Sequence, residues 1–589
     1  MITYLSNKEK WIMFFVMVAL AFVLFGNGIK GDFVYDDSWV INQNPLMGKL
    51  TEIPKIFISP YHYFQSETGL YRPMTALSLS LNAIFSSKPE IFHITNIFLH
   101  ALSAFLILIF IFKRFKSKQF AWGTSLLFLF LPIHTEAVTS ISGRADILAL
   151  LFSVGVLIFI LNQRYWLSAL ALLLALLAKE SAIGLIPLIC LMLFESKKKI
   201  IPATKEAMKF IPSGILYLIL RWTALKTHFL ANDASPVYNP LKFTDPLTRF
   251  YTALKVMLLY IWKTFIPIHL SADYSYNQIP LIRTFFNPNV LVGVSFLLLL
   301  VVLISVKKIR ESPLGFGSLF FVSTFFIISN FIVPIGTIMA ERTFYMPSLG
   351  MAVIAAYGLE VLTNWRFKKL WLAIFIVVII IYGFVIVNRN TVWANAESLF
   401  TDMATESPMS VHAKTNLGLY YIKNSQWDKG KPLLEEAYKI AEDHLPLLDS
   451  LGIVAEHEKR YKDAEQFYAR ALNIYPYSDT TLSNLGRLYF ALGQYQKTAD
   501  IYLRAFGYVN KPNFLLAYAM SESKLGSYDL AIEIIVKYYG EMPDDTSLQF
   551  ALGYAYFKKG DRVKADQYFK SSKNPNVSDE EFVKSLENF

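Results

Sequence analysis

Residues 11–29, WIMFFVMVALAFVLFGNGI, form an apolar run long enough to cross the roughly 30 Å hydrocarbon layer of a bilayer. The run follows Lys8 and Lys10 and lacks a small-residue cleavage site, so it predicts a retained membrane helix and not a removed signal peptide. The whole 589-residue chain is 54% hydrophobic and 17% charged, with a mean hydropathy of +0.39. These values lie far outside the usual range of soluble proteins, so the composition predicts a membrane protein.

Eleven further runs of similar character follow the first one. Together the twelve candidates are 11–29, 91–112, 120–141, 145–162, 165–179, 181–195, 206–225, 251–268, 288–306, 315–334, 343–363 and 369–388. Four basic clusters should face the cytoplasm. They are Lys113/Arg114/Lys116/Lys118, Lys197/Lys198/Lys199, Lys307/Lys308/Arg310 and Arg366/Lys368/Lys369. All four agree only if one candidate between the second and third clusters does not cross.

Candidate 251–268 is the one to set aside, because it carries Lys255 and Lys263 inside the run. A helix with those charges is expected to lie in the interface or to re-enter the membrane. About eleven spans remain, with the N-terminus inside and the C-terminus outside. The sequence thus predicts an all-α fold, a polytopic membrane helix bundle.

The charge distribution assigns the basic excess to the membrane part. Residues 1–400 hold 34 Lys and Arg against 19 Asp and Glu, whereas residues 401–589 hold 22 against 26. Positive cytoplasmic loops explain this excess, so no nucleic acid partner is indicated. The single cysteine, Cys190, lies in an apolar run and excludes a disulfide framework or a thiolate metal cluster.

A repeat begins at about Ser410, where the composition becomes that of a soluble domain. Small residues recur in the pairs Leu417-Gly418, Leu451-Gly452, Leu485-Gly486, Tyr518-Ala519 and Leu552-Gly553, at spacings of 34, 34, 33 and 34. A period near 34 with small residues where two helices meet is typical of tetratricopeptide (TPR) repeats, which stack into a solenoid with a concave binding face. The sequence predicts about five such repeats.

Polar residues cluster in the predicted outer loops and outer helix ends. Asp36 and Asp37 are adjacent in FVYDDSWVI, residues 33–41. The others are Arg72, His134, Glu136, Arg144, Asp146, Lys179, Glu180, Asp273, Tyr274, Glu341 and Arg342. Charged residues at membrane segments are costly and are usually paired, water-lined or functional. Because the helix count places all of them on one side, we expect them to share a single polar cavity.

Structural explanations compete with function at each of these positions. Asp36 and Asp37 could cap a short loop helix, and His134 with Glu136 could be a satisfied pair at a helix end. Lys179 and Glu180 could be solvated charges in a hairpin between two spans. Arg342 could form a structural ion pair with Glu341 or Asp273, and Arg72 could be a surface residue that positions the chain before Pro73. A zinc site at His134 is not expected, because no third ligand follows at a recognisable spacing.

Several stretches resemble the transmembrane and tetratricopeptide repeat containing family. They include FVYDDSWVINQNP, YRPMTALSLSLN, PIHTEAVTSISGRADIL, AERTFYMPSLG and RNTVWANAESLF, and they occur in order through almost the whole chain. The resemblance implies a multi-spanning glycosyltransferase of the C-type (GT-C) superfamily; animal members are implicated in protein O-mannosylation from a lipid phosphate-linked mannose. This chain departs from the animal members in having about five repeats where they have more.

The resemblance also implies that the acidic residues of the first outer loop lie at the reaction centre. Asp36 is then the general base that takes the proton of a hydroxyl acceptor in a single inverting displacement. Asp37 orients the acceptor, a basic partner or an optional cation, and the two roles could be exchanged. Arg72, Arg144, Lys179 and Arg342 are the candidates for binding the donor phosphate. His134, Glu136, Asp146, Glu180, Asp273, Tyr274 and Glu341 are the candidates for substrate binding, with Tyr274 stacking on the donor.

These expectations define two domains and their partners. Residues 1–400 form a glycosyltransferase-like membrane domain with an outer loop at 30–90, and residues 401–589 form an extracytoplasmic TPR domain that recruits an acceptor polypeptide. The donor is a polyprenyl phosphate-linked sugar. No cofactor is required; a divalent cation would be compatible with the site but is not predicted.

The sequence leaves alternatives for the membrane in which the protein resides and for the class of its function. A bacterial inner membrane is expected, with the endoplasmic reticulum membrane as the alternative. The competing functions are a polyprenyl-linked glycan ligase or polymerase and a non-enzymatic membrane scaffold that displays TPR repeats.

Overall fold

The computed structural model describes residues 6–63, 68–229, 231, 235–363, 368–505, 512–540 and 546–572. The chain forms two compact units, Met1–Leu417 and Gly418–Phe589. All regular elements in the described ranges are helical. The first unit is a bundle of apolar helices and the second is a series of helix pairs, so the all-α prediction is confirmed.

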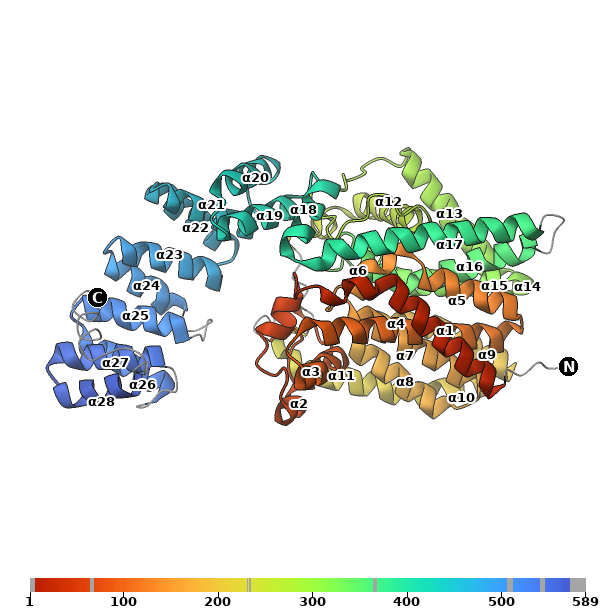
Figure 1. Ribbon diagram of the computed structural model, residues 1–589, viewed down its shortest axis with the longest axis horizontal. Coiled ribbons are helices and arrows are strands. Elements are labelled where there is room, and N and C mark those ends of the chain that lie inside the picture. Colours follow the sequence, from red (N-terminus) through yellow and green to blue (C-terminus); the bar gives the residue numbers. More distant parts are fainter. Residues whose placement is uncertain are drawn as a thin grey trace. The chain divides into compact units, whose positions relative to one another are not determined.

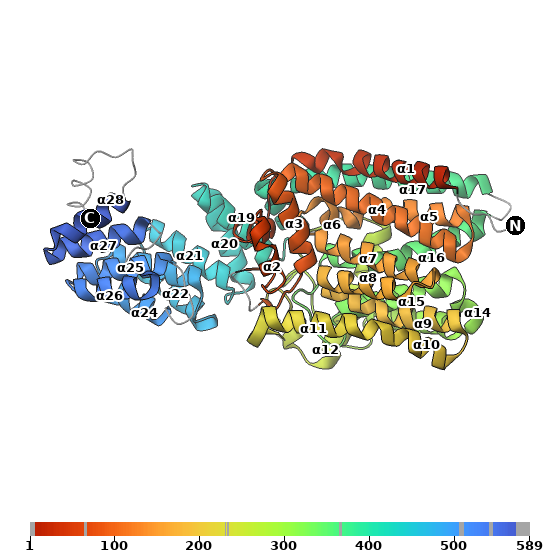
Figure 2. The same ribbon diagram turned by 90° about the horizontal axis from the view of Figure 1, so that it is seen from below.

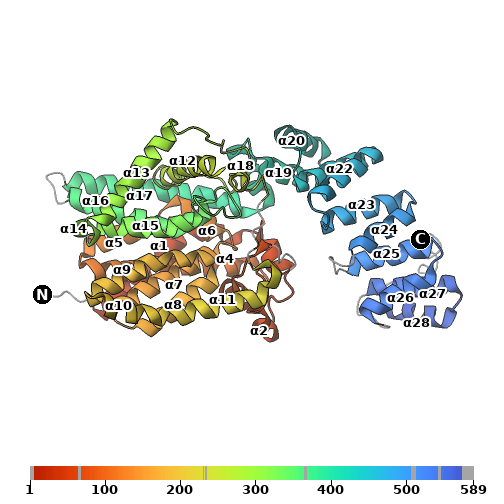
Figure 3. The same cartoon turned by 180° about the vertical axis from the view of Figure 1, so that it is seen from behind.

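Except for α10, which lies largely between two candidates, the bundle helices overlap the predicted candidates. They are α1 (Asn7–Phe25), α4 (Pro89–Phe115), α5 (Lys118–Leu129), α7 (Arg144–Leu161), α8 (Tyr165–Ala178), α9 (Ile186–Lys197), α10 (Ile200–Ala207), α11 (Ile211–Leu225), α12 (Pro246–Phe265), α13 (Pro288–Ser305), α15 (Pro313–Ile328), α16 (Pro347–Thr363) and α17 (Lys368–Asn390). Figure 1 and Figure 2 show most of them running side by side, with α13 tilted against the others in Figure 3.

Length and composition make five helical stretches in the described residues able to cross a membrane alone. They are Asn7–Lys30, Pro89–Phe115, Arg144–Leu161, Pro288–Ser305 and Lys368–Ala394, and four shorter apolar helices accompany them. The chain is therefore a membrane protein, and the count of about eleven spans stays a prediction.

Burial distinguishes central from peripheral helices. The apolar window of α7 is 72% buried, whereas those of α13 and α17 are 17% and 11% buried. The exposed surface of α17 is apolar, with Ile380 and Phe384 facing outward. A helix that is apolar on its exposed side is suited to contact lipid. We therefore interpret α7 as the centre of the bundle and α13 and α17 as its lipid-facing periphery.

One end of the bundle carries the predicted basic clusters. Lys118 pairs with Glu9 at 2.7 Å, which joins the start of α5 to the start of α1. Arg114 pairs with Glu195 at 2.7 Å, which joins the end of α4 to the end of α9. Arg366 of the fourth cluster lies outside the described residues.

Helix α12 makes contacts at both its ends with the same loop, between α15 and α16. Arg249 Nη1 donates to the Ile332 carbonyl near the start of α12, and Tyr260 Oη donates to the Ala340 carbonyl near its end. These contacts hold α12 against that loop, and the expectation that this segment does not cross the membrane stays a prediction.

Short helices form the opposite, polar end of the bundle. They are η1 (Gly26–Lys30), η2 (Ser38–Asn42), η3 (Leu50–Glu52), α2 (Ile53–Ile56), α3 (Pro73–Phe85), η5 (Pro132–His134), α6 (Thr135–Thr139), η6 (Glu180–Leu185) and η10 (Glu341–Tyr345). The turn between α6 and α7 requires Gly143, because a Cβ there would lie 2.3 Å from the Ala137 carbonyl oxygen. This tight turn places Arg144 at the start of α7.

The predicted helix pairs are present, and all of them except residues 411–417 of α19 belong to the second unit. They are α19 (Val411–Lys423) with α20 (Trp427–Ile440), α21 (Leu445–His457) with α22 (Tyr461–Ile474), α23 (Asp479–Ala491) with α24 (Tyr495–Ala505), α25 (Pro512–Lys524) with α26 (Tyr528–Tyr539), and α27 (Thr546–Lys559) with α28 (Arg562–Ser572). A Cβ at Gly452 would lie 2.4 Å from the ring of Tyr468. The small residue of the repeat therefore makes room for an aromatic ring of the second helix.

The compact units divide inside α19, after Leu417, whereas the sequence placed the domain boundary at residue 400. Helix α18 (Ala396–Glu406) packs with the first unit. Its buried Leu399 and Met403 join a cluster that includes Val34 of the first outer loop and Trp393.

Candidate active site

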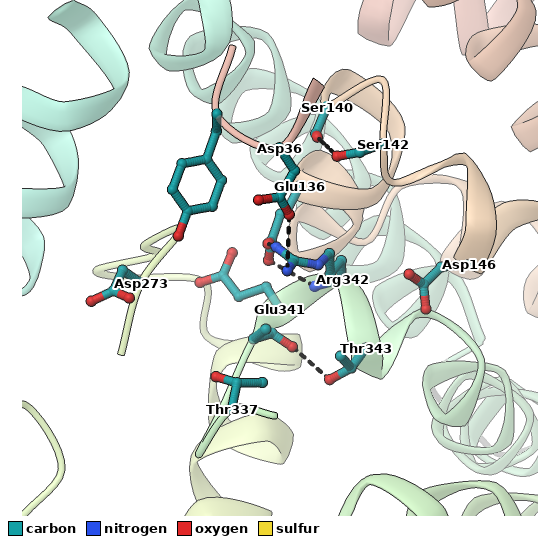
Figure 4. A network of polar contacts seen from close by, with 12 residues as sticks. Asp36, Glu136, Ser140, Ser142, Asp146, Asp273, Thr337, Glu341, Arg342 and Thr343 are labelled. Carbon is teal, nitrogen blue, oxygen red and sulfur yellow. Dashed lines mark hydrogen bonds and ion pairs between the residues drawn. The ribbon is translucent and has the colours of Figure 1, made fainter. Parts of the chain in front are cut away.

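Asp36, Glu136 and Arg342 form an ion-pair cluster at the polar end of the bundle (Figure 4). Arg342 Nη1 pairs with Glu136 Oε1, and the Arg342 backbone N–H donates to Glu136 Oε2 at 2.8 Å. Arg342 Nη2 lies 3.5 Å from Asp36 Oδ2. The side chain of Glu136 is 1% exposed, whereas those of Asp36 and Arg342 are 34% and 28% exposed. Glu136 therefore anchors the guanidinium, and its Nη2 edge and Asp36 remain accessible.

Asp37 points away from this cluster. Its Oδ2 accepts the Val34 N–H at 3.2 Å and its Oδ1 accepts the Ser142 N–H at 2.8 Å, and the side chain is fully buried. Burial raises the pKa of Asp37 to about 7, although the two backbone donors favour the carboxylate. The adjacent carboxylates thus differ in environment. Asp36 is partly exposed and can contact a ligand, whereas Asp37 is buried and links the first outer loop to the turn before α7.

Two more ion pairs connect α3, η6 and α7. Arg72 Nε and Nη2 donate to Glu180 Oε2 and Oε1 at 3.1 and 2.6 Å, in a bidentate arrangement. Lys179 Nζ contacts both oxygens of Asp146, at 2.7 and 2.6 Å, and both side chains are buried. Figure 4 shows Asp146 in the same view as Arg342, and the two charges interact, so the Lys179–Asp146 pair belongs to the same neighbourhood as the first cluster.

Electrostatics agree with this neighbourhood. Burial opposes the charge of Arg342, but Glu136, Asp36 and then Asp146 raise the pKa of its guanidinium above the ordinary value. Although burial opposes ionisation of Glu180, the ion pair with Arg72 lowers its pKa to about 2. Both groups are therefore held in their charged forms at neutral pH.

Arg144, in contrast, is enclosed by neutral acceptors. Its Nε donates to Asn96 Oδ1 at 2.7 Å, Nη1 donates to the Ser78 carbonyl and to Asn82 Oδ1 at 3.0 and 2.6 Å, and Nη2 donates to the Phe92 carbonyl at 2.8 Å. The residue is fully buried. Its hydrogen bonds tie α7 to α3 and α4, so this geometry favours a structural role over phosphate binding.

Glu341 and Asp273 occupy a separate buried network. Glu341 Oε1 accepts the Ser271 N–H at 2.8 Å and the Tyr274 hydroxyl at 2.5 Å. Burial raises the pKa of Glu341 to about 7, with Arg389 opposing this effect. Tyr274 is 4% exposed, which leaves its ring little surface for stacking on a ligand. Asp273 Oδ2 accepts the hydroxyls of Ser275 and Ser410 at 2.8 and 2.5 Å.

His134 lies deeper in the bundle than the sequence suggested. Its Nε2 contacts Ser348 Oγ at 2.8 Å, and its ring packs against those of Phe128 and Tyr345 at 4.5 and 4.6 Å between centroids. The side chain is fully buried. Direct contact between His134 and a substrate therefore stays a prediction, and the present geometry favours packing.

Two residues near Asp36 were missed by the sequence reasoning. Tyr35 Oη lies 2.9 Å from His412 Nε2, a contact between residues 377 positions apart. Tyr35 has a φ of +56°, a left-handed conformation that is uncommon for aromatic residues. The contact therefore helps to hold the loop that presents Asp36, and no motif in the sequence signals it.

A metal site is not formed by the described residues. Among them, no group of three or more His, Cys, Asp or Glu side chains could hold a metal ion. The expectation that no cofactor is required stays a prediction.

Comparisons with known proteins agree with the sequence motifs. The family model described as "Protein O-mannosyl-transferase TMTC, DUF1736" matches residues 231–301. The chain is 27% identical over 522 residues to protein O-mannosyl-transferase TMTC1 of Homo sapiens, covering 79% of this chain and 55% of the relative. It is 25% identical over 534 residues to protein O-mannosyl-transferase TMTC3 of Homo sapiens, covering 83% of this chain and 54% of the relative.

The chain spans about half the length of the curated relatives it matches. A solved structure titled "Functional Characterization of Pseudomonas Aeruginosa pilF" matches at 16% identity and a TM-score of 0.29, covering 34% of this chain and 90% of that chain. Likeness at this level carries no argument about function. The family model and the curated relatives confirm the resemblance drawn from the sequence motifs, and the chain is TMTC-like.

Proposed function

We propose that this protein is a membrane glycosyltransferase that moves a sugar, mannose by analogy with the names of its relatives, from a polyprenyl phosphate donor to a Ser or Thr hydroxyl of a polypeptide. The observation that carries the proposal is the pairing of the accessible Asp36 carboxylate with the Nη2 edge of Arg342, whose other edge is fixed by buried Glu136. A base and a cation held side by side match the two needs of the transfer.

The reaction is a single displacement with inversion at the anomeric carbon. The acceptor hydroxyl oxygen forms the new bond to that carbon while its proton passes to the Asp36 carboxylate. The bond between the anomeric carbon and the phosphate oxygen breaks, and its electron pair leaves with the lipid phosphate. Atoms and charges balance: the products are a glycoside, a protonated Asp36 and a lipid phosphate that has gained one negative charge.

Arg342 stabilises the leaving phosphate in this scheme. Its Nη2 contact with Asp36 is long, 3.5 Å, whereas its contacts with Glu136 are short. A phosphate that binds Nη2 would replace Asp36 there and free the carboxylate to accept a proton. The guanidinium is held in place before the charge develops, which is the arrangement that favours a transition state.

Other charged residues fix the segments of this end of the bundle. Arg72 pairs with Glu180, Lys179 pairs with Asp146, and Arg144 fixes the start of α7. Asp37 fixes the loop that carries Asp36, through the Val34 and Ser142 N–H groups. The TPR domain is proposed to bind the acceptor polypeptide on the outer side of a bacterial inner membrane.

Reconstitution in lipid vesicles tests the proposal. The full chain is supplied with polyprenyl phosphate-linked mannose and a peptide rich in Ser and Thr, and mannosylated peptide is measured by mass spectrometry. Asp36→Asn should lower transfer by about 10²-fold or more, the typical contribution of a general base. The matched control is Asp32→Asn, because Asp32 is an exposed carboxylate in the same loop; transfer should stay at the level of the parent. Equal transfer by Asp36→Asn and the parent would refute the mechanism.

A further inference from the structure

Two neighbouring residues of the first outer loop carry buried polar atoms that lack a partner. Tyr61 is 3% exposed, and its Oη has no hydrogen bond partner among the described residues. His62 Nδ1 is likewise buried without a partner in that part of the chain. The two rings stack at 5.4 Å between centroids. Because buried polar groups in native proteins are almost always satisfied, two such atoms on adjacent side chains need an outside partner, either a ligand or an ordered water.

The same loop shows what a satisfied tyrosine looks like. Tyr71 Oη donates to the Phe57 carbonyl at 2.7 Å. Within its described residues, the loop therefore provides a backbone acceptor for the Tyr71 hydroxyl and none for the Tyr61 hydroxyl. This contrast argues that the Tyr61 hydroxyl serves something other than the stability of the loop.

A cation lies beside these orphaned atoms. The Arg72 guanidinium carbon lies 5.5 Å from the centre of the Tyr61 ring. Glu180 binds Arg72 through Nε and Nη2, and Nη1 makes no hydrogen bond within the described ranges. Arg72 and Tyr61 also line a shallow recess that is open to solvent, whose other polar lining residues are Asn44 and Ser59. One edge of the guanidinium is thus held in place and the other is available.

The orphaned atoms also lie within the field of the proposed reaction centre. Burial lowers the pKa of His62 and favours its neutral form, while Asp36 raises this pKa and Arg72 and Arg342 lower it. All the charged groups that act on His62 are therefore candidates for the base or for phosphate binding. A neutral imidazole offers one N–H donor and one acceptor nitrogen.

We propose that Tyr61, His62 and Arg72 form a subsite for the phosphate of the donor lipid. The Tyr61 hydroxyl, an imidazole N–H and the free Nη1 of Arg72 are three donors with one positive charge, which matches a phosphate oxyanion. This inference rests on the proposed function: the phosphate that faces Arg342 Nη2 in that scheme would bind Tyr61, His62 and Arg72 through its other oxygens. It adds Tyr61 and His62 to the residues that contact the substrate.

A stability measurement tests the orphaned hydroxyl without any activity assay. Tyr61→Phe removes a hydroxyl that has no partner among the described residues, so the unfolding temperature of the full chain in detergent should equal or exceed that of the parent. Tyr71→Phe is the matched control, because it removes a satisfied hydroxyl from the same loop and should lower that temperature. A drop for Tyr61→Phe as large as the drop for Tyr71→Phe would show a structural partner and overturn the proposal.

Binding of a sugar-free lipid tests the subsite itself. The full chain in nanodiscs is titrated with undecaprenyl phosphate, and bound lipid is counted by native mass spectrometry. Tyr61→Phe and His62→Ala should each weaken binding about tenfold, the effect of losing one hydrogen bond to a charged group. His62→Asn retains an N–H near the position of Nδ1 and should recover part of the loss. Tyr71→Phe should bind the lipid as the parent does.

The source of the phosphate is decided by competition. Undecaprenol without phosphate should not compete, and inorganic phosphate should compete only at far higher concentration than undecaprenyl phosphate. Equal competition by inorganic phosphate would make the site a general anion site and overturn its assignment to the donor lipid.

The outcomes separate this inference from the proposed function. Normal lipid binding by both Tyr61→Phe and His62→Ala, together with lost transfer by Asp36→Asn, would overturn the subsite and leave the proposed function standing. Normal transfer by Asp36→Asn would instead refute the proposed function, while weakened lipid binding by the Tyr61 and His62 variants would still support a phosphate subsite.

Discussion

Arg144 and Arg342 should respond in opposite ways to the same substitution, Arg→Lys. Arg144 is fully buried and uses Nε, Nη1 and Nη2 to bind acceptors on α3 and α4. Lysine concentrates its three donors on one nitrogen and cannot reach acceptors spread around a planar guanidinium. At least two hydrogen bonds to a charged group would be lost, at about 1.5–3 kcal/mol each. Arg144→Lys should therefore reduce the free energy of unfolding by about 3–5 kcal/mol.

Arg342→Lys should mainly affect catalysis. Lysine keeps a positive charge beside Glu136, so this buried carboxylate stays paired and the loss of stability should be small. A single nitrogen cannot hold Glu136 and also present a second edge to the leaving phosphate. Transfer should fall by about 10²-fold, as is typical when one preorganised charge-stabilising donor is lost.

The assay compares both variants in two measurements on the full chain. Unfolding in detergent is followed by tryptophan fluorescence, and transfer from polyprenyl phosphate mannose is measured per folded molecule, with KM for the donor. We expect a low unfolding temperature with a near-parental donor KM for Arg144→Lys, and the reverse for Arg342→Lys. A raised donor KM with parental stability for Arg144→Lys would refute the structural role and return Arg144 to the phosphate-binding candidates.

Three further changes test other parts of the chain. Burial raises the pKa of Asp449 from 3.8 to about 7. The folded state therefore binds more protons than the unfolded state, and the free energy of unfolding should fall as pH rises from about 4 to about 7. Asp449→Asn should remove this pH dependence and stabilise the repeat domain at pH 8 by at most about 4 kcal/mol, measured by chemical denaturation. Tyr35→Phe should lower kcat by up to about tenfold through loss of one hydrogen bond. His412→Ala should lower kcat by a similar factor, and His412→Gln should restore most of the rate. A parental kcat in Tyr35→Phe would contradict the positioning role of this contact. Gly143→Ala should destabilise the bundle by about 1–3 kcal/mol through overpacking, and an unchanged unfolding temperature would argue against the tight turn.

The sequence predicted much of the candidate site by counting helices. Asp36, Arg72, Glu136, Asp146 and Arg342 were assigned to one end of the bundle because an even number of predicted spans separates any two of them. That reasoning needs only the apolar runs and the basic clusters, and it is insensitive to how the helices pack. It could not divide the charges into pairs, because residues that share an end of a bundle can still face different neighbours.

The repeats were also readable from the sequence, and for a local reason. Each helix pair depends on residues within about one period, and Gly452 and Gly486 recur where the ring of the following helix, from Tyr468 or Tyr502, needs space. The start of the second compact unit was less readable, because the apolar side of α18 packs on residues far away in the sequence.

The amino-acid sequence by itself determined the helices, the end of the bundle that holds the polar residues, and the repeat period, because each follows from short-range pattern and chain direction. Only the tertiary structure decided that Arg342 is held by Glu136, 206 positions away, that Arg72 is held by Glu180, and that Arg144 faces neutral acceptors. The physical reason is that an ion pair depends on distance and burial, which are set by the packing of helices remote in the chain.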